Sequence, residues 1–264
     1  MDSAHSAEEI PTAVVITRVA ERQWHAVRDD RVVGRGNAAD RPDGRIFLSI
    51  DSWHGAVFDQ LADAMLADLP TPLYTVVDEA DLDLTSHWER AGFTSRRREW
   101  EYVVPTDPRV TGLGSVLPPA GVTIVALGDA AERPLRELDR AIRDEVAATV
   151  GWQAMPAEVL PRPDGTTPLD PLKYAVAAQP DRYVGLVRLA PVTRQPRIGL
   201  IAVRADQHRR GIARALLAHV LGSLHRRGVE TASADVHESN GAAMALFEGV
   251  GARRASSNLE LVRR

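Results

Sequence analysis

The stretch RIGLIAVRADQHRRGIARALL, residues 197–217, joins a β-strand pattern directly to an α-helix pattern. Residues 197–203 are almost continuously apolar, which is typical of a central strand covered on both faces. From Ile212 to Leu224 apolar residues recur at helical spacing, and Gly228 follows two arginines where a helix is expected to end. The sequence therefore predicts a buried strand and an amphipathic helix, connected by a short basic turn.

The turn and first helical residues combine three arginines with a glycine, in the order His208, Arg209, Arg210, Gly211, Ile212, Ala213, Arg214. The first N–H groups of a helix have no partner within the helix, and a helix start is electropositive. A glycine there lets the phosphates of a ligand approach the backbone. The turn favours a bound pyrophosphate, although an ordinary amphipathic helix with a basic start would use similar residues.

Strand and helix patterns alternate on both sides of this stretch. In the second half we expect strands over 122–127, 173–178, 183–189 and 230–236 and near Leu259, and helices over 132–148 and 240–250. In the first half we expect a strand over 45–50 and a helix over 56–69. The predicted fold class is α/β (α+β), with mixed central sheets flanked by helices.

Composition excludes several classes of protein. The chain has 264 residues, 44% hydrophobic and 26% charged, as expected for one or two globular domains. It has no Cys, which excludes disulfides, thiolate metal sites and a cysteine nucleophile, and we expect no metal. Without a signal-peptide pattern or a run of about 18 apolar residues, the sequence predicts a cytoplasmic protein with no membrane partner. A pI near 6.1 and the lack of a basic stripe interleaved with aromatics disfavour nucleic-acid binding.

Residues 106–119 are rich in Pro, Gly, Ser and Thr, and they predict a linker between domains at 1–105 and 120–264. Before residue 120 there are 12 arginines and 20 acidic residues, a net charge of −8; from residue 120 there are 20 basic and 16 acidic residues, a net charge of +4. A positive field concentrates anionic ligands, so the second half is the better candidate for binding one. Solvated surface charges would give the same asymmetry.

A second motif, NGAAMALFEGVG, occupies residues 240–251. Together with residues 208–213 it resembles the GNAT superfamily of acyl-CoA-dependent N-acetyltransferases, whose motifs are (R/Q)-x-x-G-x-(G/A) and N-x-x-A-x-x-L-(Y/F)-E-x-x-G. The resemblance covers roughly residues 120–264, with order, spacing and flanking strands in agreement. It implies that acetyl-CoA is the acyl donor.

The resemblance also implies where coenzyme A lies. Pantetheine enters a gap between strands 198–203 and 230–236, and the pyrophosphate rests on residues 208–213. A free amine then attacks the thioester directly, and a strand N–H stabilises the oxyanion. The implied coenzyme-binding residues are Ile201, Ala202, Val203, His208, Arg209, Arg210, Gly211, Ile212, Ala213, Arg214, Asn240 and Phe247.

Proton transfer requires further residues, because a primary ammonium with a pKa near 10 must lose a proton before it attacks. The strand 197–203 has no carboxylate, where many members of the family place a Glu. The candidate bases are Asp139, Asp144, Glu145, His237 and Glu238. Phe247 stands where the family usually has a Tyr that protonates the leaving thiolate, which leaves Tyr174, Tyr183 and His237 as donors. Of these we select Glu145, His237 and Tyr183 as catalytic residues, although each is also compatible with a purely structural role.

The first half repeats part of the second. Residues 86–104 align with 245–263 at a constant offset of 159, which places Trp88 on Phe247 and Gly92 on Gly251. The earlier strand-to-helix joint, DSWHGAVFD at 51–59, keeps a Gly but has two Asp and no Arg, so it should repel a pyrophosphate. The first half therefore resembles a degenerate GNAT-like domain, as in tandem members of the family such as mycothiol synthase. It would serve as scaffold or as a wall of the acceptor cleft.

Two other segments need interpretation. Residues 31–36, RVVGRG, match the coenzyme motif by letter, but no helical pattern follows, so we expect Gly34 and Gly36 to serve a hairpin turn. Residues 151–171 contain five prolines and predict a loop, in which Trp152 and Met155 would line the acceptor site.

The predicted function is an N-acetyltransferase that acts on a primary amine of a small molecule. A protein or peptide N-acetyltransferase and a non-catalytic acyl-CoA sensor remain alternatives, the second because of Phe247 and the missing strand carboxylate. We expect a monomer or a homodimer.

Overall fold

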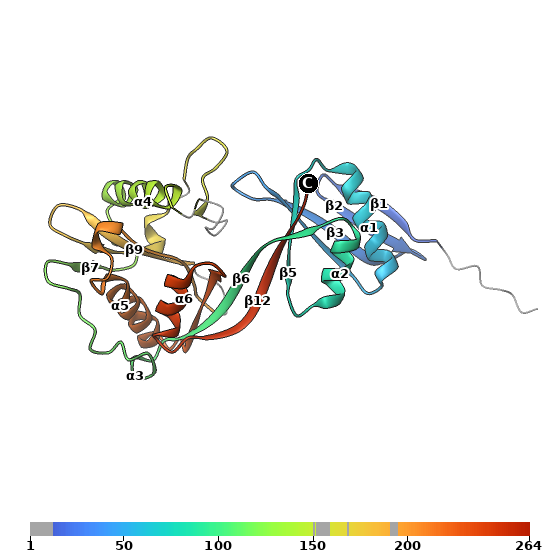
Figure 1. The fold of residues 1–264 in the computed structure, drawn as a ribbon. Coiled ribbons are helices and arrows are strands. Elements are labelled where there is room, and N and C mark those ends of the chain that lie inside the picture. The colour runs from blue at the N-terminus through green and yellow to red at the C-terminus, as the bar shows by residue number, and fades with distance from the viewer. Residues whose placement is uncertain (1–12, 150, 152–158, 168, 191–194) are drawn as a thin grey trace, which may run out of the picture.

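The computed structural model describes residues 13–149, 151, 159–167, 169–190 and 195–264, so Trp152 and Met155 lie outside the described residues. The chain begins with four consecutive strands, and helices and strands are interspersed after them (Figure 1). The elements are, in order, β1 (Val15–Ala20), β2 (Gln23–Arg28), β3 (Arg31–Asp40), β4 (Ile46–Ser52), α1 (Gly55–Asp68), β5 (Leu73–Asp78), α2 (Leu82–Arg90), β6 (Thr94–Pro105), α3 (Pro108–Thr111), β7 (Thr123–Val125), α4 (Glu132–Ala147), η3 (Pro171–Lys173), β8 (Tyr174–Ala178), β9 (Tyr183–Ala190), β10 (Arg197–Val203), η4 (Ala205–Gln207), α5 (Ile212–Arg226), β11 (Thr231–His237), α6 (Gly241–Glu248) and β12 (Arg253–Arg263).

The strands of both halves join in one mixed sheet, with the order β1-β2-β3-β4-β5-β12-β6-β11-β10-β9-β8-β7. The predicted α/β class is confirmed, and the helices and strands expected around residues 197–217 are present within a few residues of their predicted bounds. The two central sheets that we expected are continuous with one another. Figure 1 shows β6 and β12 running side by side from one half to the other.

The two halves exchange their last strands. β6 follows the first half in sequence, but it pairs antiparallel with β11 of the second half, from Thr231↔Pro105 to His237↔Glu99. β12 ends the second half, but it pairs antiparallel with β5 of the first, from Asn258↔Asp78 to Arg263↔Leu73. Each half therefore supplies a strand to the sheet of the other.

The exchange follows an internal symmetry. Glu99 and Asn258, which are 159 positions apart, are partners in the β6–β12 ladder. The irregularities of that ladder skip Ala255 on β12 and Arg96 on β6, and these residues are again 159 positions apart. The offset aligned from sequence therefore relates two structurally equivalent segments.

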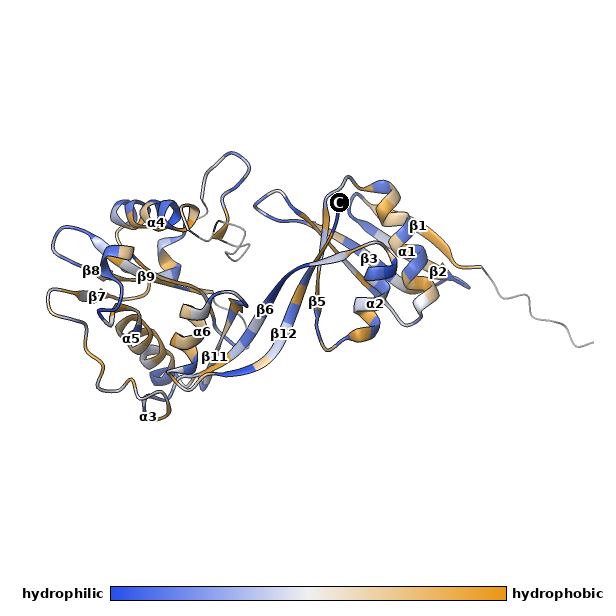
Figure 2. Cartoon of the chain, viewed as in Figure 1, coloured by the Kyte–Doolittle hydropathy of each residue, from blue (hydrophilic) through white to orange (hydrophobic). Residues whose placement is uncertain are grey.

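Helices cover both faces of the second half of the sheet. The apolar face of α5 packs on one side, where Leu216, Leu217 and Val220 are buried. α4 covers the other side through Leu135, Leu138 and Ile142, as its apolar spacing requires. Figure 2 shows the hydrophobic residues concentrated within each half, whereas the stretch where β6 and β12 cross between the halves is largely hydrophilic.

The first half has its own core beneath α1, and this core corrects the expectation for Gly34 and Gly36. Both glycines lie inside β3 instead of at a hairpin turn. A Cβ on Gly34 would lie 2.8 Å from Val57 Cγ1, and a Cβ on Gly36 would lie 2.4 Å from Met65 Sδ. The absence of a side chain at these two positions thus lets α1 pack closely on β3, which explains why glycines occur within this strand.

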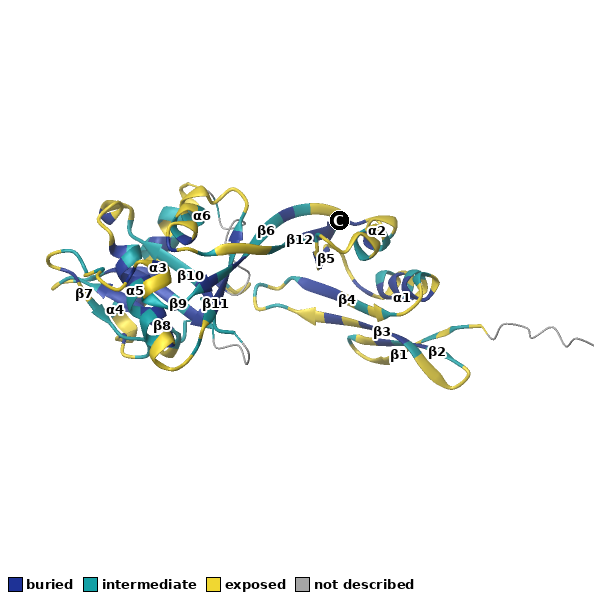
Figure 3. Ribbon diagram, turned by 90° about the horizontal axis from the view of Figure 1, so that it is seen from below, coloured by how far each residue is buried: buried dark blue, intermediate teal, exposed yellow. Residues whose placement is uncertain are grey.

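The Pro- and Gly-rich segment after β6 is packed and ordered by contacts with the second half. Thr106 is buried, and its Oγ1 donates to the Glu230 carbonyl at 3.0 Å. The segment continues through α3 to the buried Leu113. Figure 3 places α3 beside the second half.

The tryptophans of the first half differ in environment. Trp24 and Trp88 are core residues, whereas Trp53 is 90% exposed. Trp100 is half-buried on β6, with the Arg254 guanidinium 4.8 Å from its ring centre. None of the helices in the described ranges is both long and apolar enough to cross a bilayer.

Candidate active site

β10 and β11 are parallel neighbours that separate soon after they meet. They pair only at Arg197↔Ser233 and Ile198↔Ala234. On its other edge β10 stays paired with β9 as far as Val203↔Gly185, with an irregularity between Ile198 and Leu200. A bulge bends the strand that contains it, so the remainder of β10 turns away from β11. We call the unpaired region beyond Ile198 and Ala234 the β10–β11 opening. The family resemblance described above implied a gap between these strands.

The start of α5 stands at the end of this strand and is open. Gly211 is the N-cap residue, with φ of 84°, and no side chain caps the helix. A Cβ on Gly211 would have no atom within 4 Å. Arg209 also has a positive φ, of 63°. The first N–H groups of α5 therefore lack a side-chain cap, in a field that favours an anion.

The basic side chains around this start are held by different partners. Arg210 donates to the Gln207 amide oxygen, which also accepts a hydrogen bond from Gln179 at 3.1 Å. Arg214 Nη1 donates to the Gly249 carbonyl at 3.4 Å. Arg209 is exposed. Two of the three arginines next to this helix start are therefore bonded to oxygen acceptors of the protein, and Arg209 is exposed beside it.

His208 is directed back to the strand. Its Nε2 lies 2.8 Å from the Val203 carbonyl oxygen. A carbonyl can only accept, so Nε2 is the protonated nitrogen in this contact. The ring thereby joins the turn to the end of β10.

The second motif forms α6, beside the same opening. Asn240 caps this helix, its Oδ1 accepting from the Ala243 N–H at 3.0 Å. Phe247 is 2% exposed, and its ring stacks on Tyr102 of β6 at a centroid distance of 6.0 Å. The aromatic residue of the motif is therefore part of the hydrophobic core of the second half, to which β6 contributes Tyr102. The Tyr102 hydroxyl donates to Glu248 Oε1 at 2.8 Å, so it is engaged elsewhere.

The three residues selected as catalytic are not brought together. The Tyr183 hydroxyl accepts from the Ala131 N–H at 3.1 Å, at the start of α4. The Glu145 carboxylate accepts from the Ala205 N–H at 2.9 Å, near the other end of the same helix. At 1.5 Å per residue these two ends are about 20 Å apart. Tyr183 and Glu145 both hold α4 to the turns around the sheet.

The other acidic candidates also have structural partners. Asp139 is buried and pairs with Arg143 at 2.7 Å. Glu238 pairs with Arg98 at 3.4 Å. Asp144 is exposed on α4, and Tyr174 is buried beneath that helix. Within the described part of the chain, no three His, Asp or Glu side chains converge as metal ligands.

His237 ends β11 and has a defined tautomer. Its Nδ1 accepts from the Ser239 N–H at 3.1 Å and lies 2.7 Å from the Ser239 hydroxyl. Burial lowers the pKa of His237, and Arg97 adds to that effect. The neutral ring is thus favoured, with its hydrogen on Nε2, which suits a hydrogen-bond donor better than a base.

Sequence reasoning missed a row of polar side chains on one side of the sheet. Register partners in an antiparallel ladder project to the same face. His237 faces Glu99, Asp235 faces Glu101, and Glu99 in turn faces Asn258. We call this row the polar sheet face; its members are Asp235, His237, Glu99, Glu101, Ser256 and Asn258. β6 lies far from β11 and β12 in the sequence, so this row becomes visible only once the pairing of β6 with these strands is known.

Glu99 is the most unusual carboxylate on this face. Its side chain is 26% exposed and forms an ion pair with Arg97. Burial nevertheless raises the pKa of Glu99 above its ordinary value, and the neighbouring carboxylates of Asp235 and Glu260 add to the rise. Asp235 is paired with Arg197 at 3.1 Å.

The corresponding joint of the first half is closed. β4 and β5 also pair at only two positions, Ile46↔Leu73 and Phe47↔Tyr74. At the start of α1, however, a Cβ on Gly55 would lie 2.6 Å from Cε1 of His87, whose Nδ1 is 3.2 Å from Asp59 Oδ1. The His87 imidazole, held by the Asp59 carboxylate, thus covers the start of α1. The start of α5, by contrast, is open and has arginines beside it.

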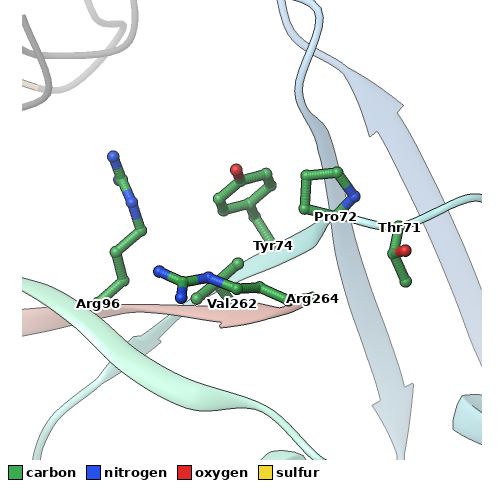
Figure 4. Close-up of a pocket in the computed structure, with 6 residues that line it drawn as sticks. All are labelled: Thr71, Pro72, Tyr74, Arg96, Val262 and Arg264. Carbon is green, nitrogen blue, oxygen red and sulfur yellow. The ribbon is translucent and has the colours of Figure 1, made fainter.

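A separate surface pocket of about 390 Å³ lies where β5, β6 and β12 meet. Figure 4 shows its lining residues, which are Thr71, Pro72, Tyr74, Arg96, Val262 and Arg264. None comes from β10, β11 or α5, so this pocket is distinct from the β10–β11 opening.

Comparison with protein families agrees with this geometry. Residues 142–252, which include β10, the start of α5 and α6, match the model of the Acetyltransferase (GNAT) family. Over these residues the second half of the chain is similar to the GNAT acetyltransferase family, and we call it the GNAT half. The GNAT half thus contains the strand opening and the open helix start described above.

Curated relatives of the GNAT half match over a short segment. The [ribosomal protein bS18]-alanine N-acetyltransferase of Escherichia coli (strain K12) is 46% identical over 56 residues, which are 21% of this chain and 38% of the relative. The protein of the same name from Salmonella typhimurium has the same identity and coverage. The chain thus spans well under half the length of these relatives.

Solved structures resemble the whole chain, including the first half. A tandem GNAT protein from the clavulanic acid biosynthesis pathway has a TM-score of 0.65 at 16% identity, covering 96% of this chain and 83% of that protein. A GCN5-related N-acetyltransferase from Sphaerobacter thermophilus has a TM-score of 0.63 at 17% identity, covering 94% and 82%. The fold of both halves together therefore resembles that of a tandem GNAT protein.

Proposed function

We propose that this protein is an N-acetyltransferase that transfers the acetyl group of acetyl-CoA to a primary amine of a small molecule. The observation that carries the proposal is the open, uncapped start of α5 at Gly211, which stands beside the β10–β11 opening. A diphosphate and an extended pantetheine chain need these two features together.

The coenzyme would be held chiefly by backbone groups. Successive residues of a strand direct their backbone groups to opposite edges, and the Arg204 N–H is bonded to the Val184 carbonyl of β9, so Ile201 and Val203 would offer their N–H and C=O groups to the opening and Ala202 would lie between them. The diphosphate would lie on the N–H groups of residues 211–213, with Arg209, Arg210 and Arg214 supplying positive charge. Asn240 would act by fixing the start of α6, and Phe247 by packing beneath it.

The residues at the opening suit direct attack by an amine. A strand N–H of β10 would donate to the oxyanion of the acyl group, and such a donor is worth about 3–4 kcal/mol of transition-state stabilisation. With no Cys in the chain, no cysteinyl intermediate forms. The amine reaches the acyl carbon as a free base after losing one proton.

The acceptor would lie on the polar sheet face, next to the opening. The two carboxylates of this face that lie nearest the opening, Asp235 on β11 and Glu99 on β6, favour a cationic amine over an anionic substrate, whereas Glu101 is held by the Ser256 hydroxyl. We assign residues 120–264 as the acetyltransferase domain and residues 1–105 as a degenerate GNAT-like domain that walls the acceptor site. The closed joint at Gly55 supports a single coenzyme site per chain.

A peptide acceptor is the second candidate. It is favoured by the curated relatives, whose name describes acetylation of an alanine of ribosomal protein bS18. A cationic peptide N-terminus would meet the same carboxylates, so chemistry at the amine does not separate the two candidates.

The experiment combines binding with turnover. Calorimetry with acetyl-CoA measures coenzyme binding, and release of free thiol is followed with a panel of small amines and with short peptides that begin with alanine. The mass of the product identifies the acceptor. Turnover with small amines is the expected result, turnover with peptides alone would favour the second candidate, and binding without thiol release would indicate a sensor.

A further inference from the structure

We propose that Glu99, which belongs to the first half of the chain, is the general base that deprotonates the acceptor amine in the second half. The inference rests on the proposed function and deepens it, because it assigns a catalytic residue at the same site. It also gives the first half a chemical role in addition to that of a scaffold.

The strand exchange places Glu99 beside the opening. β6 is the next strand after β11, and Glu99 is the register partner of His237, the last residue of β11. Adjacent strands are about 4.8 Å apart. Glu99 is therefore one strand spacing from the edge of β11 that borders the β10–β11 opening, and it projects to the same face as His237.

The surroundings of Glu99 combine partial burial with access. Charged or polar groups face it from each neighbouring strand: Arg97 on its own strand, Asp235 and His237 on β11, and Asn258 and Glu260 on β12. Its side chain remains 26% exposed, so a substrate can reach it. A carboxylate whose ionised form is made less stable by burial is a stronger proton acceptor than one in water.

The other acidic candidates are committed to structural contacts. Glu145 accepts from the Ala205 N–H, and Asp139 is paired with Arg143 and buried under α4. Glu101 accepts from the Ser256 hydroxyl, and Asp235 pairs with Arg197. Glu99 is also ion-paired, with Arg97, but its side chain is 26% exposed and it lies one strand from the opening.

The step balances as follows. The Glu99 carboxylate takes one proton from the ammonium group of the acceptor, and the nitrogen lone pair forms a bond to the acyl carbon. The carbon–sulfur bond breaks, with its electron pair remaining on sulfur. The nitrogen then loses its second proton; one of the two protons ends on the thiol and the other in solvent.

The test is a matched pair of amide variants on one strand. Glu99→Gln keeps the size and hydrogen-bonding shape of the side chain but cannot accept the proton, and we expect kcat with the best amine of the panel to fall about 100-fold or more. Acetyl-CoA affinity, measured by calorimetry, should stay within about twofold of the wild type. Glu101→Gln, two residues along the same face, should retain most of the turnover.

A pH profile separates a base from a structural residue. In the wild type, kcat/KM should rise with pH through the pKa of Glu99, and this ascending limb should be absent from the residual activity of Glu99→Gln. Glu99→Asp, which keeps the carboxylate, should recover part of kcat.

The outcomes distinguish the two proposals. If the wild type turns over and Glu99→Gln matches it, or if Glu101→Gln loses the activity instead, the role of Glu99 is overturned while the acetyltransferase assignment stands. If the wild type binds acetyl-CoA but releases no thiol with any amine or peptide, the proposed function fails, and the role of Glu99 fails with it.

Discussion

Glu99 and His237 lie directly opposite each other on neighbouring antiparallel strands, although they come from different halves of the chain. The relationship exists because β6 leaves the first half to pair with β11, while β12 returns to pair with β5. A titratable pair is thereby placed beside the opening between β10 and β11. Several properties of the protein should depend on this arrangement and on the open start of α5.

Replacing Gly211 with Val should abolish tight acetyl-CoA binding. A β-branched residue at a φ of 84° is strained by roughly 1–2 kcal/mol, and its side chain would occupy the open space over the helix start. Calorimetry should report at least a tenfold increase in Kd.

Gly228→Val is the matched control for this variant. Gly228 follows the other end of α5, has a φ of 78°, and has no atom within 4 Å of an added Cβ. Both variants should lose similar thermal stability, but only Gly211→Val should lose the coenzyme. Equal affinity in the two variants would argue against a diphosphate at Gly211.

Arg209→Ala should weaken acetyl-CoA binding about three- to tenfold, because one exposed guanidinium group is removed from beside the anion site. Raising the salt concentration should weaken the wild type more than the variant, since screening acts on the charge that the variant lacks. Arg227→Ala, at the C-terminal end of the same helix, should leave the Kd unchanged. A salt response identical in all three proteins would contradict the assignment.

Gly34→Ala should destabilise the protein by about 1–3 kcal/mol without reducing the affinity of the folded protein for acetyl-CoA. The added Cβ would lie 2.8 Å from Val57 Cγ1 and 3.2 Å from Ser52 Cβ, so strand and helix must separate. Denaturant unfolding measures the loss. Gly241→Ala, where an added Cβ has nothing within 4 Å, should cost far less.

Protein stability should also report on Glu99. Because burial raises the folded-state pKa of Glu99, its protonated form is favoured in the native protein, and native stability falls as pH rises through that pKa. Glu99→Gln lacks this titration. As the pH is raised from about 4 to neutrality, the free energy of unfolding of Glu99→Gln should therefore increase relative to that of the wild type.

Glu101→Gln, on the same face of β6, is the control for the loss of a carboxylate from this strand. A pH-independent difference for Glu99→Gln would mean that Glu99 titrates as it does in water. Arg97, Asp235, His237, Asn258 and Glu260 face Glu99, and all are retained in both variants.

Local patterns in the sequence determined most of the second half. The apolar run 197–203 and the helical spacing after Ile212 depend on residues close together in the chain, so strand, turn and helix were predictable. The basic turn at Gly211 was recognisable for the same reason, because a helix start presents its N–H groups whatever lies around it. The 159-residue offset between α2–β6 and α6–β12 was also visible as similarity between short segments.

Only the tertiary structure decided which strands are neighbours. No local pattern states that β6 pairs with β11 instead of with β5. The hydrogen bonds between strands are made by backbone groups, which are the same in nearly every residue, so long-range packing selects which strands become neighbours. For that reason sequence reasoning selected Tyr183 and Glu145, which make contacts that anchor α4, and did not include Glu99, the base that we propose. It also read Gly34 and Gly36 as turn residues, since the helix that packs on them lies beyond the next strand.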